Sequence, residues 1–70
     1  MAIEKVTLPV ARKIANLTQK GLASALGVSE STVINWEKGR SEPTIMQAQK
    51  ISELTNIPID CIIFLPSNTV

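Results

Sequence analysis

Polar side chains suited to contacting nucleic-acid bases recur on one face of the stretch 30–38. An asparagine pairs well with adenine, a serine with several base edges and a glutamate with the amino group of cytosine, and Asn35, Ser31 and Glu30 are placed for this. Ile34 shares their face and would contact a thymine methyl or a deoxyribose, or else pack beneath the following loop. Plain surface roles remain open, because the helix dipole alone favours Glu30 in a first turn. We predict base contacts by all four residues.

Two short helices joined by a sharp turn would position this face. Thr18 is a good N-cap for the first helix, and Gly27 ends it because glycine adopts the left-handed backbone without steric cost. Ser29 caps the second helix and Gly39 closes it. Two helices with a turn of about three residues fit a helix-turn-helix, whose second helix enters the DNA major groove. The inward stripe of the first helix consists of Leu22, Ala23 and Leu26.

Helices before and after this pair complete an all-α prediction. Pro9 suits the first turn of a helix because its missing N–H would be unpaired there, and Asn16 is placed to end that helix in the left-handed conformation. Thr44 caps a fourth helix, and a short fifth helix is predicted over 59–64. The residues expected to face inward from the first and fourth helices are Ala11, Ile14, Ala15, Ile45, Ala48, Ile51 and Leu54.

The length of the chain limits its organisation to one small domain. Its 70 residues bury only about 60% of the unfolded surface. We predict an arm at 1–7, either frayed or a short extended lead-in, then a domain at 8–65 and a disordered tail at 66–70. The sequence has no apolar run near the roughly 18 residues of a membrane span and no signal-peptide pattern, so we expect a cytoplasmic protein without a membrane partner.

Several kinds of chemistry are excluded by composition. The chain has no histidine and one cysteine, Cys61, so an internal disulfide, a zinc site and an imidazole acid–base group are absent. A lone cysteine also fits a reducing cytoplasm. We find neither a phosphate-binding glycine loop nor paired carboxylates at a suitable spacing. The sequence therefore predicts no enzyme, no cofactor, no metal and no small-molecule ligand.

The residue pattern resembles the phage-repressor and Cro type of helix-turn-helix, also called the xenobiotic-response-element type. The resemblance covers about residues 12–64 and implies a compact five-helix, lambda-repressor-like domain. It also implies a transcriptional regulator, most often a repressor, that binds a palindromic operator as a dimer through the helix at 30–38, and it fits a phage or mobile-element origin. The resemblance is carried in order by Arg12, Leu17-Thr18-Gln19, Leu22-Ala23, Leu26-Gly27-Val28-Ser29, Val33, Trp36-Glu37, Gly39 and Pro43.

The resemblance also assigns roles outside the base-contacting face. Gln19 begins the second helix and matches a glutamine that holds a phosphate in relatives, and here its amide could donate to Glu30. Arg12 and Glu37 match a pair that forms a structural salt bridge between helices one and three. Each phosphate-contacting candidate could instead be an ordinary solvated surface residue. The candidates are Thr18, Gln19, Thr32, Lys38 and Arg40.

The segment 57–64 is richer in large apolar residues than one short helix can bury. These residues either cover the bottom of the core or form the dimer contact that the family resemblance implies. A two-fold dimer would hold its recognition helices about 34 Å apart, on successive major-groove faces. The predicted dimer surface consists of Ile57, Ile59, Ile62, Ile63 and Phe64.

Net charge gives only modest support to a nucleic-acid partner. The chain carries a net charge of +1 and has a pI near 7.9, whereas many DNA-binding domains have a pI above about 9. Lys20, Lys38 and Arg40 border the proposed DNA face, so a local basic rim is expected. The predicted partners are double-stranded DNA and a second copy of the chain. The alternative function, favoured by the low charge and by Glu30, is a protein-interaction module of antitoxin or anti-regulator type with the same fold.

Overall fold

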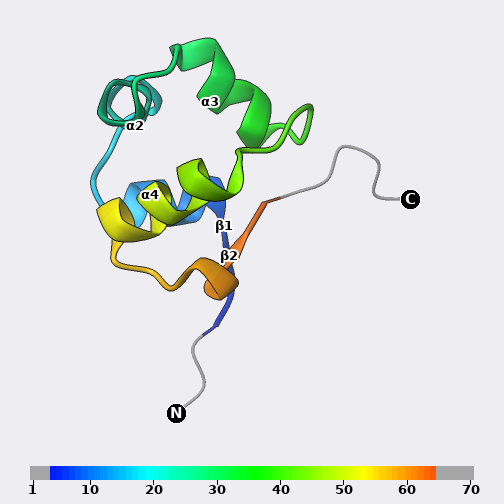
Figure 1. Cartoon of the computed structure of the whole chain (residues 1–70). Coiled ribbons are helices and arrows are strands. Elements are labelled where there is room, and N and C mark those ends of the chain that lie inside the picture. The colour runs from blue at the N-terminus through cyan, green and yellow to red at the C-terminus, as the bar shows by residue number, and fades with distance from the viewer. Residues whose placement is uncertain (1–3, 65–70) are drawn as a thin grey trace.

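The computed structural model describes residues 4–64 and is mostly helical (Figure 1). The elements of this part are β1 (Val6–Thr7), α1 (Leu8–Ile14), α2 (Gln19–Leu26), α3 (Glu30–Glu37), α4 (Ile45–Thr55), the 3₁₀ turn η1 (Ile59–Cys61) and β2 (Ile62–Ile63). In Figure 1, α2 and α3 lie above α1 and α4, and the two strands lie side by side. No helix in this range is long and apolar enough to cross a membrane. The predicted tail and the first three residues of the predicted arm lie outside the described residues.

Side chains of the N-cap residues cap three of the helices, as the sequence predicts. The Thr18 hydroxyl accepts the N–H of Gly21 at 2.8 Å. The Thr44 hydroxyl accepts the N–H of Gln47 at 3.1 Å, and the Gln47 side chain accepts the N–H of Thr44 in return, which makes a capping box. The Ser29 hydroxyl accepts the N–H of Thr32 and so caps α3, without the reciprocal bond of a capping box. Each cap satisfies a backbone donor that the first helical turn leaves unpaired.

Left-handed residues end the first three helices. Asn16, Gly27 and Gly39 have φ values of 60°, 71° and 76°. In each case the N–H of the next residue bonds to the carbonyl five positions back, at 2.9–3.0 Å, which is a Schellman motif. The chain then turns back toward the core, and Leu17 and Val28 pack against it. The predicted endings at Asn16, Gly27 and Gly39 are therefore confirmed.

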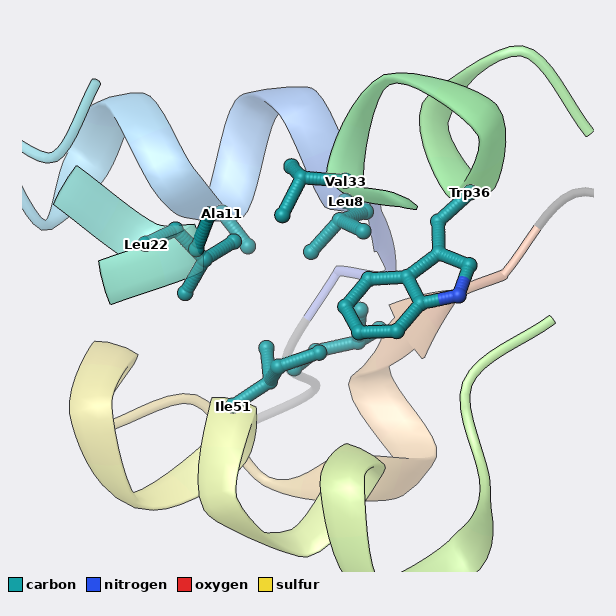
Figure 2. Packing of buried hydrophobic residues seen from close by; sticks show 8 residues of the cluster. Leu8, Ala11, Leu22, Val33, Trp36 and Ile51 are labelled. Atoms are coloured by element: carbon teal, nitrogen blue, oxygen red, sulfur yellow. The ribbon is translucent and has the colours of Figure 1, made fainter. Parts of the chain in front are cut away.

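One hydrophobic cluster holds the helices together (Figure 2). Leu8, Leu22, Val33 and Ile51 are almost completely buried. Figure 2 shows the indole of Trp36 extending from α3 toward Leu8 of α1 and Ile51 of α4, so that the side chain joins these three helices. Full burial of each large side chain contributes about 1.5–3 kcal/mol. Because this cluster holds the inner face of α3 against the core, it also fixes which side chains of α3 lie on the outer face.

The predicted fifth helix over 59–64 is wrong. The chain makes the single 3₁₀ turn η1 and then β2, which pairs in parallel with β1, so that Val6 lies opposite Ile62 and Thr7 opposite Ile63. The two adjacent isoleucines are β-branched and favour an extended backbone, and β1 supplies the backbone partners that a lone strand would lack. Residues 6–7 of the predicted arm thus form part of a small sheet.

Two residues predicted to face inward are exposed instead. Ile14 is 59% exposed and Ile45 is 76% exposed. Ile14 is the last residue of α1 and Ile45 the first of α4, so both side chains lie beyond the edge of the cluster. Ala11 and Ile51, which lie further inside the same two helices, are buried as expected. Apolar spacing finds the inner face of a helix but does not show where along that helix the core stops.

Candidate nucleic-acid interface

The outer face of α3 carries the four residues proposed to contact bases. Glu30 and Ser31 are exposed, whereas Ile34 and Asn35 are half-buried. Among the described residues, no hydrogen bond engages the side chains of Glu30, Ser31 or Asn35. Their donors and acceptors are therefore available to a ligand. Ile34 is partly exposed and partly buried, so its burial does not separate the two interpretations of this residue.

The turn before α3 engages the hydroxyl of Thr32. The Ser29 hydroxyl accepts the N–H of Thr32 at 3.2 Å, and the two hydroxyl oxygens lie 2.9 Å apart. Either hydroxyl can be the donor of this contact, and where the Ser29 O–H donates to Thr32, the Thr32 O–H is left to donate elsewhere. Such a donor is suited to a phosphate oxygen.

Arg12 and Glu37 form the ion pair that the family resemblance implies. Arg12 Nε donates to Glu37 Oε2 at 2.7 Å and Arg12 Nη2 donates to Glu37 Oε1 at 3.3 Å, so the contact is bidentate. Arg12 Nη1 also donates to the carbonyl of Leu17 at 3.0 Å. The Arg12 and Glu37 side chains are only 11% and 7% exposed. The pair therefore ties α1, the turn after it and the end of α3 together.

Gln19 belongs to this network as well. Its Nε2 donates to Glu37 Oε1 at 3.0 Å, so the expected donation to Glu30 is wrong. The carboxylate of Glu37 is a charged acceptor in a mostly buried position, where a hydrogen bond is stronger than at the exposed Glu30. Eighteen residues separate Gln19 from Glu37, and no local pattern in the sequence indicates their contact.

Basic side chains border the face where α3 ends. Lys38 is the C-cap of α3, and the turn at the buried Gly39 separates it from Arg40. Both side chains are exposed. At the start of α2, the N-cap Thr18 and Lys20 in the first turn are exposed as well. The rim therefore has positive charge at two places, while Glu30 adds a negative charge on α3 itself.

The segment 57–64 does not form one exposed apolar surface. Ile62 is 5% exposed and belongs to the core, and Ile57 and Phe64 pack partly against it. Ile59 and Ile63 are each 37% exposed. Successive side chains of a strand point to opposite faces, so Ile62 turns inward and Ile63 outward in β2. The prediction that Ile62 belongs to the dimer surface is thus wrong. Among the predicted dimer residues, mainly Ile59 and Ile63 are exposed enough to contact a second copy.

A second exposed apolar site, which was not predicted from the sequence, lies at the start of α4. Met46, in the first turn of α4, is 80% exposed beside Ile45. Met46 lines a shallow groove of about 470 Å³ together with the end of α2 and Lys50. The sequence feature that indicates this site is the apolar pair Ile45–Met46 directly after the N-cap Thr44. The first turn of α4 lies beyond the edge of the core, so both side chains are exposed.

A helix-turn-helix with a buried inner face and a polar outer face defines the class of this domain. The profile of the helix-turn-helix family matches residues 10–60, which is most of the chain. The chain belongs to the Cro/C1-type helix-turn-helix family. The resemblance described from the sequence is therefore confirmed.

Three relatives of the chain are all named as HTH-type transcriptional regulators. It is 43% identical over 49 residues to an uncharacterised HTH-type transcriptional regulator of Methanocaldococcus jannaschii, with 70% of this chain and 74% of that protein covered. Uncharacterised HTH-type transcriptional regulators of Methanothermobacter thermautotrophicus and Archaeoglobus fulgidus are 44% and 38% identical. The match with the Methanothermobacter protein covers 59% of this chain and 59% of that protein. The match with the Archaeoglobus protein covers 64% of this chain and 63% of that protein. No solved structure matches the chain.

Proposed function

We propose that this chain is a nonenzymatic transcriptional regulator that binds DNA sequence-specifically through the outer face of α3. The observation that carries the proposal is the arrangement of α3, whose inner side is buried through Val33 and Trp36 while its outer polar side chains have no partner among the described residues. Membership of the Cro/C1-type family and the names of the relatives support it.

Base recognition follows from the chemistry of three side chains. With α3 in the major groove, the Asn35 amide pairs with N6 and N7 of adenine, which is a bidentate contact. Ser31 bonds to a neighbouring base edge, and Glu30 accepts from the amino group of a cytosine. Ile34 contributes an apolar contact to a thymine methyl or a sugar. Each good bidentate contact discriminates against a wrong base by about 1–3 kcal/mol.

Phosphate contacts on both sides of α3 fix its register in the groove. Lys38 and Arg40 bind the backbone beyond the end of α3, and Thr18, Gln19 and Thr32 bind it at the starts of α2 and α3. Because cations displace condensed counterions, affinity falls as salt rises. With a net charge of only +1, overall affinity depends on this local rim.

The regulator acts as a two-fold dimer on a palindromic operator, and its occupancy represses transcription. A dimer places two copies of α3 about 34 Å apart, which matches half-sites one helical turn apart. Ile59 and Ile63, the exposed members of the 57–64 segment, are the apolar contacts between the copies.

Selection of bound sites from a random duplex pool tests the proposal. The selected duplex is then titrated by fluorescence anisotropy with wild type, Ser31→Ala, Asn35→Ala and Gln49→Ala, an exposed control on α4. We expect a palindrome with half-sites about 10 bp apart. Asn35→Ala should lose about 1–3 kcal/mol at one base position, and Gln49→Ala should lose nothing. A pool without an enriched motif, with all variants folded, would contradict sequence-specific binding.

The alternative function is a protein-interaction module of antitoxin or anti-regulator type. The exposed pair Ile45 and Met46 beside the groove at α4 favours it, because exposed apolar residues that gather at one place mark interaction sites. Salt separates the two functions. A DNA complex weakens steeply between 50 and about 200 mM salt, whereas an apolar protein interface responds little.

A further inference from the structure

The Gln19 side chain is held before any DNA arrives. Its amide donates to Glu37 Oε1, and the same carboxylate receives two N–H groups from Arg12. A carboxylate only accepts hydrogen bonds, so it selects the amide orientation in which the nitrogen of Gln19 points toward it. Gln19 is also the first residue of α2, where backbone N–H groups and the helix dipole favour an anion.

We propose that Glu37 is a positioning residue for DNA binding, acting through Gln19. An amide nitrogen carries two N–H groups, and Glu37 engages one of them, which leaves the second to donate to a DNA phosphate at the start of α2. This inference rests on the proposed function, because it names how one phosphate contact of that interface is prepared.

Two properties of the network suit this role. A free glutamine loses rotamer freedom when it binds, whereas a side chain already held by Glu37 loses little. The charge of Glu37 is also neutralised by Arg12 at 2.7 Å, so the carboxylate orients the amide without repelling the phosphate. Glu30, which the sequence suggested as the partner of Gln19, has no such neutralising neighbour in the described network.

A double-mutant cycle on DNA affinity tests the coupling. Phosphate contacts do not depend on sequence, so a labelled 20-bp duplex of arbitrary sequence at low salt is a sufficient probe, with about 50 mM salt as the starting condition. The variants are Gln19→Met, Glu37→Gln and the double variant. Lys20→Met is the matched control, because Lys20 lies in the same turn but has no bond to Glu37.

The expected pattern is a loss that depends on the partner. Gln19→Met should weaken binding about fivefold in the wild-type background, which is the effect of one net hydrogen bond. In the Glu37→Gln background the same change should cost less than about twofold. Lys20→Met should weaken binding by the same factor in both backgrounds. Circular dichroism and thermal melting establish that every variant is folded at the temperature of the titration.

Side-chain amide NMR of the wild type tests the inference without substitution. Addition of the duplex should shift the Gln19 Nε2 protons and leave those of the exposed Gln49 unchanged. If Glu37→Gln does not fold, this measurement still decides whether Gln19 contacts DNA, on which the positioning role of Glu37 depends.

Three outcomes would overturn the inference. An equal loss for Gln19→Met in both backgrounds means that Glu37 does not position it, and no loss in either background, or unshifted Gln19 protons, means that Gln19 does not contact DNA. If wild type still selects an operator, the proposed function survives these results. Failure of wild type to bind any duplex removes both.

Discussion

Removal of the Glu37 carboxylate is expected to destabilise the domain strongly. In Glu37→Ala, the guanidinium of Arg12 keeps only the carbonyl of Leu17 as a partner, although its side chain is 11% exposed. The amide of Gln19 loses its acceptor as well. A mostly buried charge left without its partner costs about 3–5 kcal/mol.

This cost is large relative to the stability of so small a domain. A chain of 70 residues has a free energy of unfolding of roughly 4–10 kcal/mol. Each lost kcal/mol lowers the melting temperature of a domain of this size by about 4–8 °C, so Glu37→Ala should lower it by at least about 12 °C. The exposed Glu53 on α4 is a matched control, and Glu53→Ala should stay within about 0.5 kcal/mol of wild type.

Urea unfolding followed by tryptophan fluorescence measures these changes. Trp36 is the single tryptophan of the chain and is 4% exposed, so its emission reports the opening of the core. Beside Glu37→Ala, the comparison includes a cycle of Arg12→Met, Glu37→Leu and the double variant Arg12→Met/Glu37→Leu. Since apolar residues often replace a buried ion pair without loss, the double variant should lose less stability than either single variant.

Two results would refute this reasoning. One is a loss below about 1 kcal/mol for Glu37→Ala, since that is the range of an exposed ion pair. The other is a double variant whose loss equals the sum of the single losses, which means that the two residues do not interact. If Glu37→Ala is unfolded even at low temperature, a folded double variant still supports the prediction, and an unfolded one contradicts it.

Three further predictions concern α2, β2 and the basic rim. Alanine usually stabilises a helix by about 1 kcal/mol relative to glycine, but Gly21→Ala should raise the free energy of unfolding by clearly less than this. The reason is that the new Cβ would lie 3.1 Å from the Thr18 hydroxyl that caps α2, and a full gain in urea titration would contradict it. Ile62→Ala should cost about 2–5 kcal/mol and Ile63→Ala much less, since only Ile62 is buried; equal losses in the same titration would argue against the orientation of β2. Lys38→Gln and Arg40→Gln should each reduce the slope of log affinity against log salt by about 0.9, and an unchanged slope would remove that residue from the phosphate contacts.

The sequence by itself determined where the two helices around the turn begin and end. It also determined the family to which the chain belongs. Thr18, Ser29 and Gly27 act through hydrogen bonds that span three to five residues, so their effect can be predicted from the neighbouring sequence alone. The burial of Val33 and Trp36 follows in the same way from their spacing on one side of α3. The outer face of α3 was predictable because it is the side opposite to these two residues.

Only the tertiary structure decided which distant groups meet. Gln19 bonds to Glu37 rather than to Glu30, and β2 forms where a helix was predicted because β1, more than fifty residues earlier, lies beside it. The opposite orientations of Ile62 and Ile63 depend on that pairing. Such outcomes depend on the competition between partners that are far apart in the chain, and the chemistry of each residue alone does not settle it.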